Sequence, residues 1–300
     1  MIARHVELIV TIADAGTLAA AAVRLNKSQP AISKALQSAE RDIGCRIFQR
    51  HAHGVVPTTE GQSIVERCRM VHRELERMAD DVNRSDAGFG GTLNLIVSPV
   101  AAVHILPPVL RRFSNRFPGV QVQVTGGHSN KAFHMLRKRE ADFVIGPAPE
   151  AGEDAGLRSV NLMSNGITFV TGAQSKYAGE TDPKVLQGAR WLLIGPRERR
   201  PLYTDFFVAH GLTPPRPAVC SDSILTLFSL LESSDVVCSI PSLLLPMVQA
   251  RWRLATLPVA LDGPIIQIAL TMLAGRIPTN AEVAFEDVLV EEVARSPVLT

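Results

Sequence analysis

A row of amide, hydroxyl and basic side chains between residues 28 and 41 has the types and the spacing of a hydrogen-bonding surface. Gln29, Ser33 and Gln37 recur every four residues, so a helix would carry them on one side together with Lys34 and Arg41. Amides and hydroxyls can hydrogen-bond base edges in the major groove of DNA, and Lys and Arg can bind phosphates. The row therefore predicts a surface that reads double-stranded DNA.

The helix that would carry this row has clear ends. Ser28 is a typical N-cap, and Pro30 is tolerated in the first turn because its missing N–H is not needed there. Gly44 ends the helix. Its opposite side is apolar, and five residues fall within one arc of about 100°: Ile32, Ala35, Leu36, Ala39 and Ile43. We expect that side to be buried and the polar side to be free.

Two further helices precede this one. Residues 3–15 have apolar side chains at helical spacing and stop at Gly16, and Thr17 can cap a second, alanine-rich helix over residues 18–25. A short turn at residues 26 and 27 leads to Ser28. Two short helices joined by a tight turn, the second with one buried and one free face, predict a helix-turn-helix.

The charge of this region favours a polyanion as partner. Six basic residues and two acidic residues give residues 24–50 a local net charge of +4, whereas the whole chain carries only +2. The basic residues are Arg24, Lys27, Lys34, Arg41, Arg46 and Arg50. An ordinary solvated surface explains the charge alone equally well, so the interpretation depends on its combination with the helix pattern.

A small β-hairpin is predicted after the third helix. Residues 45–61, CRIFQRHAHGVVPTTEG, read as a short strand, a turn at HAHG and a second strand. Arg46, Arg50, His51 and His53 could then lie over the phosphate backbone. His51 and His53 could also be a metal pair, but no Cys or acidic ligand follows at usable spacing.

The clearest periodicity in the chain lies in residues 60–86. Its apolar residues are spaced 4, 3, 4, 3, 4 and form an a/d seam: Ile64, Cys68, Val71, Leu75, Met78 and Val82. Charged residues occupy the other faces. An amphipathic helix lying on its own domain is the alternative, but the narrow seam favours a pairing helix. A dimer would present two reading helices to a two-fold site.

The remainder of the chain, from residue 92, alternates strands and helices, which predicts parallel sheets covered by helices. In such sheets, ligands bind beyond the carboxyl ends of the strands. Polar or strand-end residues at those places are the candidates for a small-molecule site: Ser98, His128, Ser129, Asn130, Gly146, Pro147, Arg197, Asp222 and Ser223. Each serine could instead be a simple N-cap. Arg199 and Arg200, beside Arg197, could bind an acid or be solvated.

The N-terminal part of the chain resembles the LysR-type transcriptional regulators. The resemblance begins in VTIADAGTLAAAAVRLNKSQPAISKALQSAERDIGCRIFQR and continues through GVVPTTEG. The family pattern S-Q-P-A-(V/I)-S stands at residues 28–33, and E-x-x-(L/I)-G-x-x-(L/I)-F-x-R stands at residues 40–50. Weaker similarity continues through RFPGVQVQV and READFVIG, so the resemblance covers nearly the whole chain. The sequence departs from the family pattern at Thr17-Leu18, Ala20, Ala39 and Pro57-Thr58. The alanine at position 20 puts some phosphate contacts of the second helix in doubt.

The resemblance implies an α/β, two-lobed sensor like a periplasmic binding protein, an N-terminal all-α winged helix-turn-helix domain and a long linker helix. The expected domains are residues 1–59, 60–88 and 89–300, with lobe I at 89–164 and 265–300 and lobe II at 165–264. The implied DNA-binding residues are Thr17, Ser28, Gln29, Pro30, Ser33, Lys34, Gln37, Arg41, Arg50 and His53. A weaker similarity points to a subgroup linked to sugar and aromatic-acid catabolism.

The implied partners are a promoter site with dyad symmetry, a second copy in a homodimer or homotetramer, RNA polymerase and a small-molecule effector; no cofactor is implied. The chain shows neither a signal pattern nor an apolar run of about 18 residues, so we expect a cytoplasmic protein. An α/β enzyme with Ser98 or Cys220 as nucleophile is an alternative, although no GxSxG, HExxH or P-loop is present. Another is a thiol sensor that pairs Cys220 with Cys238, although Cys238 lies in an apolar run; with Cys45 and Cys68, these thiols suit simple packing.

Overall fold

The computed structural model divides the chain into two compact units, Met1–Gly91 and Thr92–Thr300. Each unit is described by itself. The structure describes residues 5–51, 54–82, 90–127, 129–150, 152–197, 199–260 and 266–296, without the side chains of 80–82, 129 and 130. None of the described helices combines the length and the apolar character needed to cross a bilayer.

Unit 1 begins with three helices whose ends follow from local side chains: α1 (Val6–Ala15), α2 (Leu18–Arg24) and α3 (Gln29–Ile43). Gly16 ends α1 in the left-handed conformation (φ 68°), which favours glycine. Thr17 Oγ1 accepts a hydrogen bond from Ala20 N at the start of α2, and Ser28 Oγ accepts one from Ala31 N at the start of α3. Gly44 then ends α3. The predicted caps are therefore the observed ones.

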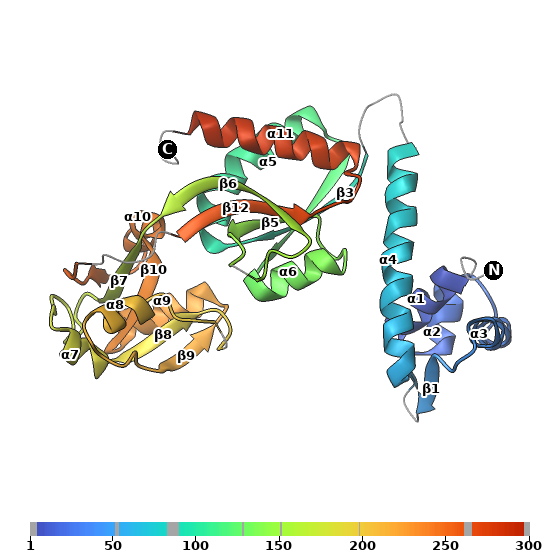
Figure 1. Ribbon diagram of the computed structural model, residues 1–300, viewed down its shortest axis with the longest axis horizontal. Coiled ribbons are helices and arrows are strands. Elements are labelled where there is room, and N and C mark those ends of the chain that lie inside the picture. Colours follow the sequence, from blue (N-terminus) through green and yellow to red (C-terminus); the bar gives the residue numbers. More distant parts are fainter. Residues whose placement is uncertain are drawn as a thin grey trace. The chain divides into compact units, whose positions relative to one another are not determined.

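A two-stranded hairpin and a long helix complete unit 1. Strands β1 (Phe48–His51) and β2 (Gly54–Pro57) pair antiparallel and form the predicted wing. Helix α4 (Thr59–Val82) then runs beside α1, which it contacts extensively (Figure 1). The core of unit 1 is mainly aliphatic, and Ile9, Ile12, Ile32 and Ile47 are completely buried in it.

The first lobe of unit 2, called lobe I here, is a five-stranded sheet in the order β4-β3-β5-β12-β6. Helices α5 and α11 pack with one another on one of its faces and α6 lies on the other (Figure 1). The elements are β3 (Gly91–Val97), η2 (Ala101–Ile105), α5 (Leu106–Arg116), β4 (Val120–Gly126), α6 (Ser129–Arg137), β5 (Phe143–Pro147), β6 (Leu157–Asn165), β12 (Ile266–Leu273) and α11 (Asn280–Arg295).

The second lobe, lobe II, is another five-stranded sheet, in the order β11-β7-β10-β8-β9. Its core contains a cluster of aromatic rings in which Trp191 contacts Phe169, Tyr203 and Phe207. The elements are β7 (Ile167–Gly172), α7 (Pro183–Gln187), β8 (Arg190–Ile194), α8 (Thr204–Ala209), β9 (Pro217–Ser221), α9 (Ile224–Ser233), β10 (Val236–Pro241), η3 (Ser242–Leu244), α10 (Leu245–Gln249) and β11 (Leu254–Thr256).

The expectation that both sheets are parallel is wrong, because both are mixed. Strand β3 runs parallel to β5, and β8 runs parallel to both β9 and β10. However, β12 is antiparallel to β5 and β6, and β7 is antiparallel to β10 and β11. The reversed strands, β7 and β12, are the first strands after the chain changes lobes. Strand β7 begins at Ile167, directly after β6 ends at Asn165, and β12 is the strand with which the chain returns to lobe I.

Candidate functional site

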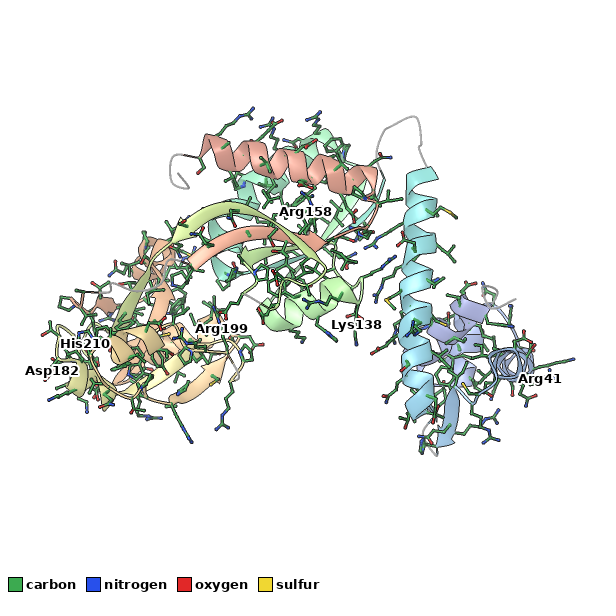
Figure 2. The ribbon with its side chains drawn as sticks, in the orientation of Figure 1. Arg41, Lys138, Arg158, Asp182, Arg199 and His210 are labelled. Carbon is green, nitrogen blue, oxygen red and sulfur yellow. The ribbon has the colours of Figure 1, made fainter. Side chains whose placement is uncertain are left out.

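Helix α3 divides into a buried and a free side, as its sequence pattern predicts. Ile32, Leu36 and Ala39 are buried in the core of unit 1, and Ala35 and Ile43 pack against that core. The other side is solvent-facing: Gln29, Pro30, Lys34, Gln37 and Arg41 are exposed and Ser33 is half-buried. Figure 2 shows Arg41 projecting from α3 away from the other helices of unit 1.

The wing is fastened to the free side of α3 by a contact that the sequence pattern does not indicate. Arg50 Nη2, on β1, donates a hydrogen bond to Ser33 Oγ at 3.0 Å. Arg50 is exposed, so its guanidinium keeps donors available to solvent at the edge of the α3 surface. Arg50 and Ser33 therefore belong to one continuous polar surface.

Glu40 fixes the start of the wing from inside unit 1. Its Oε1 accepts hydrogen bonds from the backbone N–H groups of Ile47 at 2.8 Å and Phe48 at 3.2 Å. This carboxylate is therefore a structural group. Thr17 and Ser28 likewise use their hydroxyls as caps, and the predicted DNA contacts of these two residues stay predictions. His53 lies outside the described residues.

The predicted pairing seam on α4 needs correction at its N-terminal end. Cys68 is only 6% exposed and Ile64 is half-buried, because α4 packs there against the core of its own unit. Little of either side chain is available to a second copy. Val71, Leu75 and Met78 remain exposed, Met78 by 60%, and they form the part of the seam that a partner could cover. The side chain of Val82 lies outside the described residues.

A cavity of about 600 Å³, counted with its opening to solvent, lies between the two lobes of unit 2. Its lobe I wall comes from the carboxyl ends of three strands: Ser98 follows β3, Gly127 follows β4 and Pro147 ends β5. The lobe II wall likewise comes from the carboxyl ends of two strands, with Leu193 and Ile194 from β8 and Ser239 and Pro241 from β10. The remaining described lining residues are Pro99, Val100, Arg199, Leu202, Leu244, Ile266 and Ile268.

Three polar side chains line this otherwise apolar cavity. Ser98 (8% exposed) comes from lobe I and Ser239 (5% exposed) from lobe II. Arg199 is the one ionisable group among the described lining residues. Its Nη1 donates to the carbonyl of Ile194 at 3.2 Å. Burial lowers the pKa of Arg199, and the negative charge of Glu150 partly offsets this effect. The guanidinium nevertheless stays charged, because arginine starts from a very high value.

Two family models cover most of the chain. Residues 3–62 match the model of the bacterial regulatory helix-turn-helix protein, lysR family, and residues 86–294 match the model of the LysR substrate binding domain. The chain belongs to the LysR family of transcriptional regulators. The first match contains α1 to α3 and the wing. The second contains both lobes and the cavity between them.

Curated LysR-type relatives are similar over most of their length. The HTH-type transcriptional regulator GbpR of Rhizobium radiobacter is 26% identical over 242 residues, which cover 79% of this chain and 80% of that protein. The HTH-type transcriptional regulator GalR of Pseudomonas putida is 27% identical over 288 residues, covering 94% and 72%. Both the helix-turn-helix and the effector-binding half of this chain therefore belong to the LysR type.

Solved structures of LysR-type regulators share the fold. CbnR, a LysR family transcriptional regulator, superposes with a TM-score of 0.69 at 22% identity, covering 98% of this chain and 99% of that one. A second CbnR structure, with the same TM-score, is complexed with its target DNA. A full-length OxyR variant from Pseudomonas aeruginosa has a TM-score of 0.68 at 19% identity and covers 100% and 96%.

The structure brings some of the predicted effector residues of this LysR-type chain together. Ser98 and Pro147 line the cavity, and Gly146 lies directly behind Ser98: a Cβ on Gly146 would meet Ser98 Cβ at 3.2 Å. His128 lies outside the described residues, as do the side chains of Ser129 and Asn130. Their neighbour Gly127 is in the lining.

Three other predicted effector residues lie outside the described lining. Arg197 is exposed, whereas Arg199 on the same loop lines the cavity. Asp222 and Ser223 are exposed at the end of β9. They follow β9, the edge strand of its sheet, whereas the strands of lobe II that line the cavity are β8 and β10. Ser239 was not foreseen; the sequence signal is a single hydroxyl near the end of an otherwise apolar strand.

The cysteine geometry argues against a disulfide between Cys220 and Cys238. Both thiols are free. Cys220 of β9 pairs with Leu193 and Cys238 of β10 pairs with Leu192, so β8 lies between them. Two strand spacings are about 9.5 Å, whereas a disulfide needs Cα atoms closer than about 7 Å. Burial raises the pKa of the Cys238 thiol to about 12, which keeps it in its unreactive neutral form. Within the described residues, no group of His, Cys, Asp and Glu could hold a metal ion.

Proposed function

We propose that this LysR-type regulator binds a two-fold DNA site through α3 and the wing, as a homodimer or a homotetramer. The observation that carries the proposal is the division of α3 into a buried apolar side and an exposed amide, hydroxyl and basic side. Gln29, Ser33 and Gln37 would contact base edges, and Lys34, Arg41 and Arg50 would bind phosphates. Such a complex would act on RNA polymerase at a promoter in the cytoplasm.

We further propose that a small effector in the cavity between the lobes controls this binding. The cavity opens to solvent, has a mostly apolar lining with a few polar groups, and lies beyond the carboxyl ends of strands from both lobes. A ligand that contacts both lobes favours one lobe arrangement over another, and such a shift can change how two copies present their α3 helices. The division of labour among residues 1–59, 60–88 and 89–300 is part of this proposal.

The DNA-binding part is tested with a duplex selected from a random pool by the unaltered protein. Gln29→Ala and Ser33→Ala should each weaken binding to that duplex by about 1–3 kcal/mol, because each removes a base contact. Gln29→Ala should not change binding to an unrelated duplex; Ser33→Ala also removes the hydroxyl that holds the phosphate-binding Arg50, so Gln29→Ala carries this comparison. Lys34→Ala should weaken binding to both duplexes and reduce the dependence of the affinity on salt.

Glu7→Gln supplies the matched control, since Glu7 is an exposed residue of α1 outside the α3 surface. It should bind like the unaltered protein. Equal binding of the selected duplex by the Gln29 and Ser33 variants would show that α3 does not read bases. Circular dichroism on each variant establishes that it is folded.

We also propose that the chain is not an enzyme. Ser98 faces the cavity, but a nucleophilic serine needs a neighbouring base. The described lining contains no carboxylate, imidazole or lysine that could accept its proton. Hydrolysis of a small ester by the purified protein that Ser98→Ala abolishes would contradict this proposal.

A further inference from the structure

We propose that the cavity between the lobes takes a compact monocarboxylate with an apolar body, held by Arg199 and by one hydroxyl from each lobe. This inference rests on the proposed function, in which the cavity is the effector site. It goes further because it names the chemical class of the ligand and assigns Arg199 and Ser239 as the residues that select it.

The walls of the cavity favour an apolar ligand body. Most of its described lining is aliphatic, including Val100, Leu193, Leu244, Ile266 and Ile268. A sugar has a hydroxyl on nearly every carbon, and each buried hydroxyl without a partner is costly. Beyond two serines and one arginine, the described lining offers no side chain that could satisfy them. A hydrocarbon chain or ring would instead release water from both surfaces.

Arg199 supplies the charge that a carboxylate needs. It is partly buried, and none of the carboxylates in the described part of the chain forms an ion pair with it; Glu150 acts only through its field. Its neighbour Arg200, by contrast, is paired with Asp205. A partly buried guanidinium with one carbonyl partner keeps several donors for a ligand, and its planar fork matches a carboxylate. With one cation in the described lining, one carboxylate is matched and a second would be buried without a partner.

Ser98 and Ser239 place one hydroxyl on each side of the ligand. Ser98 Oγ caps the following helical turn by accepting from Ala101 N at 3.4 Å, which leaves its hydroxyl hydrogen free to donate. Ser239 is 95% buried, and among the described residues its hydroxyl has no hydrogen-bond partner. A carboxylate on Arg199 could therefore accept from hydroxyls of both lobes. Figure 2 shows Arg199 on the side of lobe II that faces lobe I.

Binding of matched small molecules to the full chain, without DNA, tests the ligand class. The carboxylate probes are isovalerate, cyclohexanecarboxylate and benzoate; their amides keep the shape and remove the charge. Gluconate keeps the charge and has a polar body, and galactose has neither feature. Trp191 is buried in β8, whose end lines the cavity, so tryptophan fluorescence and the melting temperature can report binding. At least one carboxylate probe should bind about 10- to 100-fold more tightly than its amide and than gluconate.

Substitutions test the assigned residues. Arg199→Gln should raise the Kd of that carboxylate by about 10- to 100-fold and leave the Kd of its amide unchanged. Arg199→Lys should keep part of the affinity, and Ser239→Ala should weaken it by a smaller factor. Arg197→Gln is the matched control, because Arg197 is exposed on the same loop and is absent from the lining. The melting temperature without ligand, and binding to the selected duplex, establish that each variant is folded.

Three results would overturn the ligand class: galactose or gluconate binding more tightly than every carboxylate probe, amides binding as tightly as their carboxylates, or no saturable response to any carboxylate up to about 10 mM. Unchanged carboxylate affinity in Arg199→Gln would overturn the role of Arg199. These failures are separate from a failure of the proposed function. If a carboxylate binds as predicted but α3 variants read DNA normally, the DNA proposal fails and the ligand class stands.

Discussion

At the scale of single residues, Gly61 shows how closely the parts of unit 1 approach. It lies in the first turn of α4, and a Cβ added there would come within 1.9 Å of the backbone carbonyl oxygen of Ile47. Backbone cannot move aside as a flexible side chain can. We predict that Gly61→Ala lowers the free energy of unfolding of unit 1 by about 1–3 kcal/mol, because the clash is an overpacking defect.

Denaturant unfolding of the full chain, followed by two signals, isolates this effect. The chain has two tryptophans, Trp191 and Trp252, and both lie in unit 2. Gly61→Ala should therefore move part of the helical circular dichroism transition to a lower denaturant concentration, while the midpoint of the fluorescence transition stays unchanged. Gly126→Ala is the control, since no atom lies within 4 Å of the position that an added Cβ would take. A Gly61 variant as stable as the unaltered protein would contradict the described packing.

Whether the sequence predicts a functional residue depends on whether its position is set locally. The free side of α3 was predictable, because caps at Ser28 and Gly44 and a regular apolar spacing determine which side is buried. The sequence leaves Arg199 open between binding an acid and being solvated, and it does not predict Ser239, because their meeting depends on which strands are neighbours in a sheet. In the sequence, Arg199 lies in a loop after a predicted strand, and Asp222 lies just before a predicted helix. In the structure, Arg199 follows β8 and lines the cavity, whereas Asp222 follows the edge strand β9 and lies outside the described lining.

At the scale of elements, the π-helical segment η2 and the residue before it pack into the cores of both lobes. Val100 and Val103 pack into the core of lobe II, whereas Ala101 and Ile105 belong to the core of lobe I. His104 Nε2 is hydrogen-bonded to the carbonyl oxygen of Leu243 at 2.8 Å. The turn between Ser98 and η2 lines the cavity, so a ligand there contacts the segment that both lobes share.

We predict that His104→Ala destabilises unit 2 by about 1–3 kcal/mol, because the partly buried carbonyl of Leu243 loses its partner. Denaturant unfolding monitored by tryptophan fluorescence measures the change. His134→Ala on α6 is the control, since His134 is exposed. If both variants unfold at the same denaturant concentration, the contact between η2 and Leu243 contributes nothing to joining the lobes.

The sheet direction shows a second limit of the sequence at this scale. Alternating strands and helices correctly predicted an α/β fold, but not the reversed direction of β7 and β12. Parallel pairing was inferred from the helical connections. The chain instead crosses between lobes with almost no connection, since only Gly166 separates β6 from β7, and local patterns do not record that crossing.

At the scale of the whole molecule, paired reading of DNA requires two copies held together. Leu75 and Met78 are exposed apolar residues at a and d positions of α4. We predict that Leu75→Glu together with Met78→Glu shifts the protein toward monomer, because two like charges would be buried in the seam. Sedimentation velocity measures the change, and Glu76→Gln, off the seam, is the control. An unchanged sedimentation coefficient for the double variant would place the pairing surface elsewhere.

Whether two copies read DNA as a pair is measured by the affinity of the unaltered protein for selected duplexes in which the spacing between half-sites is changed. Two α3 helices held as a pair should meet half-sites on one face of the duplex, separated by whole helical turns. An insertion of about five base pairs should therefore weaken binding strongly, and an insertion of about ten should restore much of it. Affinity that is the same at every spacing would contradict paired reading of DNA by α3.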